Sequence, residues 1–299
     1  MPRSDRERLA RGPHGWSFRS QKRVYEAVGP AYLVPKSVYS LELLRTVLYI
    51  CIPTYNEAPT IGVLLWRIRA VFQEYPKEYE ILVYDDSSTD STAATLEPYK
   101  EVLPLSVIKG DARAGYGHAV EACFRQVVRR TRYPRRDAMI VMQADFTDLP
   151  EQIPELVRRF EGGADVVVAD RTGSAGLPKP VRRLRQLSSV LTKRFTGLTG
   201  VGDPFCGFRL YRVSVIKDLL AARGNAGLAP AAGLGANLQL LLSVARHARR
   251  VESVPLPVSY DIRVRESRVR PVGDAMDLYK FALRNWKAPV PATPARAAR

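Results

Sequence analysis

The sequence is short of the residues that cross-link small secreted domains or hold structural metals. It has three cysteines and three histidines in 299 residues. Cys51, Cys123 and Cys206 lie far apart, and no two of them form a CxxC pair. This spacing argues against a disulfide framework and a structural zinc site, and it favours a reducing compartment. Because His14 and His247 lie outside any motif, a Ser-His-Asp hydrolase is excluded as well.

Long apolar runs are also missing. Residues 1–22 are dense in arginine and contain no apolar stretch, so no secretory signal is expected there. The longest uncharged stretch, 224–245, is interrupted by Pro230, several glycines and polar amides. It is too polar and too broken for a transmembrane helix, and we expect a loop that leads into a buried helix over 236–246. The corresponding expectation is a cytoplasmic protein, peripheral on the cytoplasmic face of the membrane.

Acidic residues are outnumbered. The chain has 46 Lys and Arg against 30 Asp and Glu, a net charge of +16 and a pI of about 10.0. Such a surface suits a polyanion, which is nucleic acid, an anionic membrane leaflet or a phosphorylated substrate. The plain alternative is a solvated surface on an arginine-rich chain. Nucleic acid is not expected as a partner, because no recognised motif or interleaved aromatic pattern supports it.

Apolar segments of two periods alternate along the first half of the chain. Buried strands are expected over 45–53, 80–84, 105–109, 138–142 and 165–169. Helices are expected over 60–74, 91–99, 118–130 and 151–160. This alternation predicts an α/β fold: a doubly wound, mainly parallel sheet with helices on both faces. Ligands of such sheets bind at the loops that follow the carboxyl ends of the strands.

One domain with two ragged ends is the simplest organisation. Residues 1–45 are expected to form a basic N-terminal arm, and residues 46–270 the main domain. The remainder, 271–299, is expected to contain a C-terminal helix and a disordered tail rich in Pro, Ala and Arg.

Acidic side chains follow three of the expected strands. The segments are 53–57 (PTYNE), 85–90 (DDSSTD) and 143–148 (QADFTD). Acids at the ends of buried strands are costly for a core but suit a polar ligand: Asp86 a base or ribose, and Asp145 a divalent metal. For Asp90 and Asp148 the alternative is helix N-capping, since both precede expected helices.

Six short motifs in a fixed order make the pattern specific. They are PTYNE (53–57), DDSSTDST (85–92), RAGYGHAV (113–120), QADFTDLPE (143–151), ADR (169–171) and DPFCGFRLYR (203–212). Their order and spacing resemble the family 2 glycosyltransferases of the GT-A fold, and within them the dolichol- or polyprenyl-phosphate sugar synthases. The resemblance implies inverting transfer of a hexose from a GDP- or UDP-linked nucleotide-sugar to a polyprenyl or dolichyl phosphate, with Mg²⁺ or Mn²⁺ as cofactor.

The resemblance also implies a donor-binding set. Its members are Pro53, Tyr55, Glu57, Asp86, Arg113, Gln143, Arg265 and Arg268. Pro53, Tyr55 and Glu57 are expected to line the nucleoside pocket, whereas Arg265 and Arg268 belong to a basic cap on the diphosphate. Gly115 and Gly117 would let the backbone approach the donor closely, or simply form a tight turn before the helix.

The metal position departs from the family. Gln143 stands where the family has the first acid of its DxD pair, and Asp145 is retained. An amide carbonyl coordinates a hard cation with less charge than a carboxylate does, so we expect Asp145 to be the main metal ligand and catalytic residue, with Gln143 beside it. The alternative is a degenerate protein that binds a nucleotide-sugar without transferring it.

The acceptor side is expected to be basic. Segment 178–194 has helical period, and Arg185 and Ser189 stand one turn apart on one face, as in the family's acceptor-phosphate element. With Arg171 they would clamp a phosphate through guanidinium hydrogen bonds. A solvated amphipathic surface helix is the alternative.

Asp203 and Arg209, in the last motif, complete the catalytic candidates. A hydroxyl acceptor, including a soluble one, would need a general base, for which Asp203 is the candidate. A phosphate acceptor is already ionised at neutral pH, and Asp203 would then orient the acceptor loop. In either case we expect a single in-line displacement, accelerated by positioning and by stabilisation of the leaving diphosphate.

Overall fold

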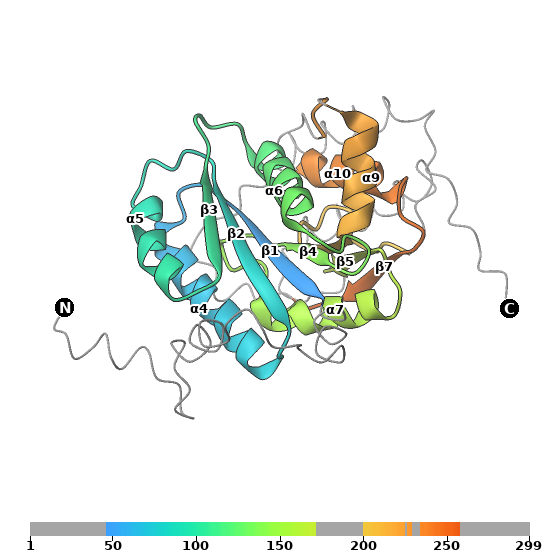
Figure 1. Cartoon of the computed structure of the whole chain (residues 1–299), viewed down its shortest axis with the longest axis horizontal. Helices are drawn as coiled ribbons and strands as arrows, with labels where there is room; N and C mark the ends of the chain where they lie inside the picture. Colours follow the sequence, from blue (N-terminus) through green and yellow to red (C-terminus); the bar gives the residue numbers. More distant parts are fainter. Residues whose placement is uncertain (1–45, 172–199, 225, 229–233, 258–299) are drawn as a thin grey trace, which may run out of the picture. The chain divides into compact units, whose positions relative to one another are not determined.

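A seven-stranded sheet organises the described part of the chain (Figure 1). The computed structural model describes residues 46–171, 200–224, 226–228 and 234–257. The strand order is β3-β2-β1-β4-β6-β5-β7. The strands are β1 (Val47–Thr54), β2 (Glu78–Asp85), β3 (Leu105–Lys109), β4 (Ala138–Val141), β5 (Val166–Asp170), β6 (Arg209–Arg212) and β7 (Val251–Pro255).

Most of this sheet is parallel, as the sequence predicts. Strand β1 pairs in parallel with β2 and β4, β2 with β3, and β5 with β7. Only β6 of the described strands runs the other way, antiparallel to both β4 and β5. The α/β prediction is therefore confirmed, and β6 and β7 are strands that the apolar patterns did not reveal.

Helices cover both faces of the sheet (Figure 1). One face carries α4 (Ala58–Glu74), α5 (Thr92–Leu96) with the 3-10 helix η1 (Glu97–Glu101), and α7 (Ile153–Glu161) after the 3-10 helix η2 (Pro150–Gln152). The other carries α6 (Tyr116–Arg130), α9 (Val213–Arg223) and α10 (Leu234–Ala245). The helices expected over 60–74, 118–130, 151–160 and 236–246 are confirmed with small shifts of their ends, and the one expected over 91–99 changes to a 3-10 helix halfway.

The core lies on both sides of the central strands. Residues 48–52 of β1 and 138–142 around β4 are all buried, as expected of strands covered on both faces. Cys51, Cys123 and Cys206 are free and buried. Within the described ranges, no helix is long and apolar enough to span a bilayer.

Several expectations fall outside the described residues. They are the basic arm over 1–45, the acceptor helix over 178–194, the Arg265 and Arg268 cap, and the segment over 271–299. These, and the domain boundaries, stay predictions.

Candidate active site

Three backbone positions at one edge of the sheet are strained. Asn56, Ser87 and Phe146 are the non-glycine residues with positive φ in the described part of the chain, at 54°, 57° and 59°. They follow β1, β2 and β4, three strands that run in the same direction. Such conformations cost on the order of 1 kcal/mol or more each and persist where the surroundings enforce them, often at functional sites. Strain therefore gathers where the sequence predicts the site.

The loops after β1 and β2 are joined by hydrogen bonds. The backbone N–H of Asn56 donates to Ser88 Oγ at 2.9 Å, and the N–H of Glu57 donates to Thr92 Oγ1 at 2.9 Å. The Asp90 carboxylate accepts from the N–H of Ala58 at 3.2 Å and of Thr92 at 2.9 Å. Ala58 and Thr92 are the first residues of α4 and α5. Asp90 thus serves two helix N-termini, which supports the capping alternative for this acid.

Asp86 fixes a third loop on the other two. It is buried, and its two oxygens accept hydrogen bonds from the N–H groups of Ala114 and Gly115, both at 2.8 Å. Gly115 has a φ of 92°, which glycine adopts at no steric cost, and α6 begins at the next residue. The turn interpretation of this glycine is confirmed. Each Asp86 oxygen retains acceptor capacity, so a donor contact is compatible with this anchoring.

The predicted nucleoside residues come together around this junction. The Arg113 guanidinium lies 4.0 Å from the centre of the Tyr55 ring, a cation–π contact between two of the loops. Pro53 is half-buried in β1, beside Tyr84 of β2 in the strand register. Glu57, also half-buried, accepts a hydrogen bond from the Thr60 hydroxyl at 3.1 Å. Three segments of the chain thus meet at one edge of the sheet.

The loop after β4 presents the predicted metal residues. Gln143 and Asp145 are half-buried, whereas Ala144 and Phe146 between and after them are buried. Asp145 Oδ1 accepts a hydrogen bond from the N–H of Thr147 at 3.0 Å, which fixes the carboxylate on its own loop. Burial alternates along this stretch, and both predicted ligands stand at half-buried positions.

Behind this loop lies a buried ion pair. Asp148 is 0% exposed and Arg171 3% exposed, and they are bonded through Asp148 Oδ1. The other oxygen, Oδ2, accepts the N–H of Gln143 at 2.7 Å. Burial raises the pKa of the Asp148 carboxyl, and Arg171 opposes that shift. Asp148 therefore holds the backbone of the loop after β4, and these contacts are not those of a helix cap.

Arg171, predicted in the phosphate clamp, reaches the site through this pair. Its guanidinium lies 6.0 Å from the ring centre of Phe208, and its Nε is buried without a hydrogen-bond partner in the described structure. Its expected companions Arg185 and Ser189 lie outside the described residues. The clamp stays a prediction.

Asp203 and Arg209, of the motif at 203–212, are buried and bind backbone groups of the protein. Arg209 is fully buried and donates to the carbonyl oxygens of Asn237 at 2.6 Å and Pro204 at 2.7 Å. Asp203 is also fully buried, and its Oδ1 accepts the N–H of Phe205 at 3.2 Å. These contacts fix the loop before β6, so the two side chains act on the position of this loop.

The acids at this edge suit a metal ion that is bound partly by substrate more than a metal ion that is bound by protein ligands alone. Among the described residues, no three His, Cys, Asp or Glu side chains gather in a ready-made metal cluster. Mg²⁺ commonly binds through one or two carboxylates together with substrate phosphates and water. One accessible carboxylate on Asp145 and one amide on Gln143 fit that chemistry, with a diphosphate as the remaining ligand.

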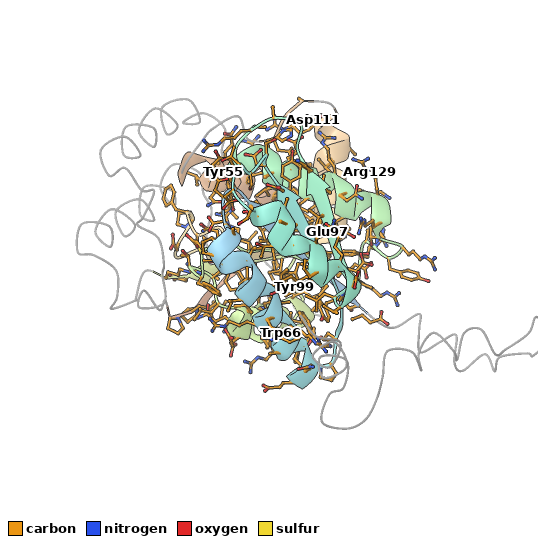
Figure 2. All side chains as sticks on the ribbon, turned by 90° about the vertical axis from the view of Figure 1, so that its left-hand side faces the viewer. Tyr55, Trp66, Glu97, Tyr99, Asp111 and Arg129 are labelled. Atoms are coloured by element: carbon orange, nitrogen blue, oxygen red, sulfur yellow. The ribbon has the colours of Figure 1, made fainter. Side chains whose placement is uncertain are left out.

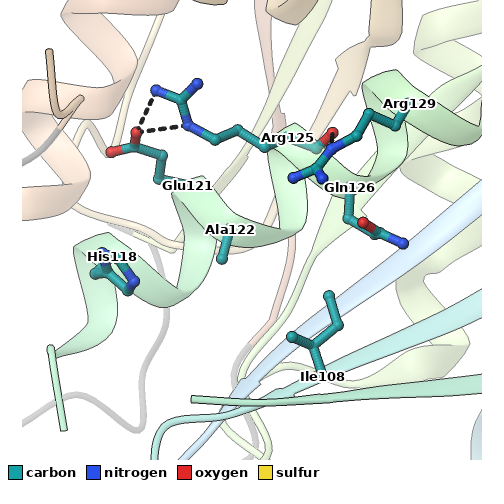
Figure 3. Close-up of a pocket in the computed structure, with 7 residues that line it drawn as sticks. All are labelled: Ile108, His118, Glu121, Ala122, Arg125, Gln126 and Arg129. Atoms are coloured by element: carbon teal, nitrogen blue, oxygen red, sulfur yellow. Dashed lines mark hydrogen bonds and ion pairs between the residues drawn. The ribbon is translucent and has the colours of Figure 1, made fainter. Parts of the chain in front are cut away.

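A separate hollow of about 330 Å³ runs along α6 beside β3 (Figure 3). His118, Arg125 and Arg129 line it from α6, and Ile108 lines it from β3. In Figure 3 Arg125 is turned to Glu121, its ion-pair partner at 2.8 Å. None of the predicted site residues within the described ranges lines this hollow, so it is not the candidate site.

Known proteins match both the motifs and the fold. The profile described as Glycosyl transferase family 2 matches residues 49–220, more than half of the chain. The chain belongs to this family.

Sequence relatives of this family 2 chain are named as lipid-phosphate sugar transferases. It is 33% identical over 197 residues to undecaprenyl-phosphate 4-deoxy-4-formamido-L-arabinose transferase of Pseudomonas aeruginosa (strain LESB58), covering 64% of this chain and 53% of that protein. It is 31% identical over 204 residues to the protein of that name from Pseudomonas fluorescens (strain Pf0-1), covering 68% and 55%. The chain spans about half the length of these relatives.

Solved structures confirm the GT-A fold. Glucosyl-3-phosphoglycerate synthase from Mycobacterium tuberculosis, in complex with Mn²⁺, UDP-glucose and phosphoglyceric acid, superimposes with a TM-score of 0.56 at 20% identity over 88% of this chain and 86% of that one. Mannosyl-3-phosphoglycerate synthase from Rubrobacter xylanophilus gives 0.53 at 19% identity over 83% and 75%. At these identities the likeness concerns the fold.

Sequence reasoning missed the supporting contacts of this family 2 site. The bond from Asp148 to Gln143 joins residues five apart, but its partner Arg171 is 23 residues away. Asp148 and Arg171 belong to two of the motifs and have opposite charges, and this was the feature of the sequence that could have indicated their ion pair. Asp90 likewise needed the position of α4, 32 residues away along the chain.

Ser87 provides a test of backbone strain at the site. Its hydroxyl donates to the Gly110 carbonyl at 2.8 Å. Ser87→Ala removes this bond and keeps the strained Cβ, so we expect the free energy of unfolding to fall by about 1 kcal/mol. Ser87→Gly also removes the Cβ and should recover about 1 kcal/mol relative to alanine. Denaturant unfolding compares the two variants, and a glycine variant less stable than the alanine variant would contradict the strain.

Arg171 provides a test of the buried pair. Arg171→Met leaves the Asp148 carboxylate buried without its counter-ion, and we expect the free energy of unfolding to fall by about 3–5 kcal/mol. Adding Asp148→Asn removes the uncompensated charge and should restore much of this loss. Thermal unfolding followed by circular dichroism measures both. Equal destabilisation of the single and double variants would show that the two groups are not coupled.

Proposed function

We propose that this chain transfers a hexose from a GDP- or UDP-linked sugar to a polyprenyl or dolichyl phosphate with inversion. The observation that carries the proposal is the gathering of four motif-bearing loops at the carboxyl edge of the sheet, with accessible Asp145 at the end of β4. Family membership supports the reaction class, and the names of the relatives at 31–33% identity support the acceptor.

The donor nucleoside would bind at the junction of the first three loops. Tyr55 and Arg113, already in contact, offer an aromatic face and a cation to the base and phosphates. Asp86 holds the backbone of residues 114–115 in place, so that this loop can approach the donor closely. Pro53 and Glu57 would form the adjacent wall. Arg265 and Arg268 would cap the diphosphate from another part of the chain.

Asp145, with Gln143, would hold Mg²⁺ or Mn²⁺. A cation there neutralises charge on the diphosphate and makes it a better leaving group. The pair of Asp148 and Arg171 fixes the backbone of Gln143 from behind, which preorganises these two ligands. With an amide in place of the first acid, the cation is held by less protein charge.

The acceptor would attack the anomeric carbon from the side opposite the diphosphate. A phosphate oxygen is ionised at neutral pH and needs no base, which agrees with the burial of Asp203. Asp203 and Arg209 then act by fixing the loop before β6, while Arg171, Arg185 and Ser189 would draw the phosphate in. Because the acceptor is a membrane lipid, the protein would work in peripheral contact with the cytoplasmic face of an anionic membrane.

Two alternatives use the same fold. A soluble hydroxyl acceptor would require Asp203 to reach the substrate as a base. A degenerate protein would bind the nucleotide-sugar without transfer, and Gln143 is the residue that favours it. Retention of Asp145 at an accessible position favours transfer.

The decisive experiment is a transfer assay. We expect the purified chain to form a sugar-phosphate lipid from undecaprenyl phosphate and one of the GDP-, UDP- or dTDP-sugars when Mn²⁺ or Mg²⁺ is present. Mass spectrometry of the extracted lipid detects the product, and a thermal-shift screen first selects the donor, because a bound ligand raises the melting temperature. Donor binding without transfer to lipid, hydroxyl acceptor or water would identify a binding protein instead.

The metal position is tested by two opposite substitutions. We expect Asp145→Ala to lower kcat/KM by about 10²–10³-fold, since it removes charge next to the leaving group. Gln143→Asp restores the acid of the family and should lower the Mn²⁺ concentration that gives half-maximal rate. Initial rates across a Mn²⁺ titration measure both. Turnover of Asp145→Ala at the wild-type rate would refute the assignment.

A further inference from the structure

Helix α4 exposes an apolar line on its outer face. Its inner face buries Ile61, Leu64, Leu65 and Ile68. Its outer face carries Pro59, Val63, Trp66 and Ala70, hereafter the α4 stripe, all exposed. The Val63 and Trp66 side chains are 55% and 45% exposed. Spacings of four, three and four residues align the stripe on one side of the helix, where a surface helix ordinarily places polar residues.

Two arginines border the stripe, and of the two only Arg69 has no acidic partner among the described residues. The Arg69 guanidinium lies 4.7 Å from the centre of the Trp66 ring. Arg67 forms an ion pair with Glu151 at 2.8 Å. Tryptophan next to arginine is typical of the boundary between a bilayer and water, where the ring sits among headgroups and the guanidinium reaches anionic phosphate.

The stripe lies on a face of the described domain where α4 and η1 are neighbours. Figure 2 shows Trp66 and Tyr99 on the side that faces the viewer, on α4 and η1 respectively. A Cβ at Gly62 would lie 2.7 Å from the Tyr99 hydroxyl, so η1 packs directly against α4. Helix α4 and η1 therefore lie next to each other and contribute to the same surface.

Its dimensions favour a bilayer over a protein partner. From Pro59 to Ala70 an α-helix rises roughly 16 Å, and the stripe is a single line of side chains. A stable protein interface buries about 800 Å² on each partner, more than one such line provides. An interfacial helix needs only to insert its apolar line about 5–10 Å into the headgroup region.

The stripe is also connected to the candidate site. It begins two residues after Glu57, at the edge where the motif-bearing loops gather. The Arg67 guanidinium lies 5.6 Å from the ring centre of Phe146, in the loop that carries Asp145. A membrane that contacts α4 is therefore next to the elements that would receive a lipid phosphate.

From these observations we infer that the α4 stripe is the surface by which this protein rests on an anionic bilayer, with Val63 and Trp66 inserted and Arg69 at the phosphates. The inference rests on the proposed function, in which the acceptor is a membrane lipid. A stripe of this size gives reversible binding, which suits an enzyme that must collect a soluble donor between turnovers.

Vesicle co-sedimentation tests the inference. We expect wild type to sediment with vesicles of phosphatidylethanolamine and phosphatidylglycerol, and Val63→Ser with Trp66→Gln to weaken that binding about tenfold. Tyr133→Ser is the matched control, since Tyr133 is 40% exposed in the loop that precedes β4, and it should bind as wild type does. Val63→Ser alone, with a smaller loss, serves if the double variant fails to fold by circular dichroism.

Fluorescence locates the inserted side chain. In a Trp16→Phe, Trp286→Phe background, brominated lipids should quench Trp66. Unaltered sedimentation of the α4 variants, or no quenching, overturns the inference. So does a wild-type dimer that dissociates in these variants, because a second copy would then cover the stripe.

Activity separates this inference from the proposed function. The α4 variants should transfer sugar to a short-chain, water-soluble prenyl phosphate at the wild-type rate, and should lose rate only with undecaprenyl phosphate in vesicles. Equal losses on both acceptors overturn the docking role. If wild type transfers to neither acceptor, the proposed function fails, whereas the sedimentation result still decides whether α4 binds membranes.

Discussion

The buried pair of Asp148 and Arg171 is the interaction on which the geometry of the site depends. One carboxylate oxygen holds the backbone of Gln143, and the other meets a guanidinium from the end of β5. Removing either side chain would leave the other charge buried without its counter-ion, which is strongly destabilising. Because Phe208 lies against the same guanidinium, three motifs separated in sequence are held in one arrangement. The loop that carries the accessible Asp145 is thus held from behind by a pair that is buried from solvent.

The fold was predictable where buried strands are continuous runs of apolar residues. Segments such as 138–142 are continuous apolar runs, and only a strand or helix covered on all sides tolerates them. Strand β6 was not predictable in this way, because its four residues include Arg209 and Arg212. Hydrogen bonds to the carbonyl oxygens of Pro204 and Asn237 compensate the burial of Arg209, and no local pattern specifies a partner as distant as Asn237, 28 residues away.

The candidate site shows the same division. Which acids stand at strand ends follows from the order of strands and motifs, so the positions of Asp86 and Asp145 at the sheet edge were predictable. What each acid does depends on contacts across the sheet edge: Asp86 binds amides 28 and 29 residues away, and Asp90 binds the start of a helix that precedes it. Strain at Ser87 and Phe146 was likewise invisible, because serine and phenylalanine give no sign of a left-handed backbone.

Charge gives the last constraint on how the site can work. The described residues contain 22 basic and 22 acidic side chains, so the whole net charge of +16 belongs to the rest of the sequence. The described part of the site therefore has little excess positive charge: its accessible side chains include both Arg113 and Asp145, and the buried Arg171 and Arg209 already donate hydrogen bonds within the protein. A diphosphate brought to Asp145 needs positive charge from elsewhere. Under the proposed function a divalent cation would supply part of it, and the amide of Gln143 would lessen the repulsion that a second carboxylate would add. An enzyme of this composition would depend less on protein charge at its metal and more on the arginine-rich segments that flank β5 and β7 in the sequence.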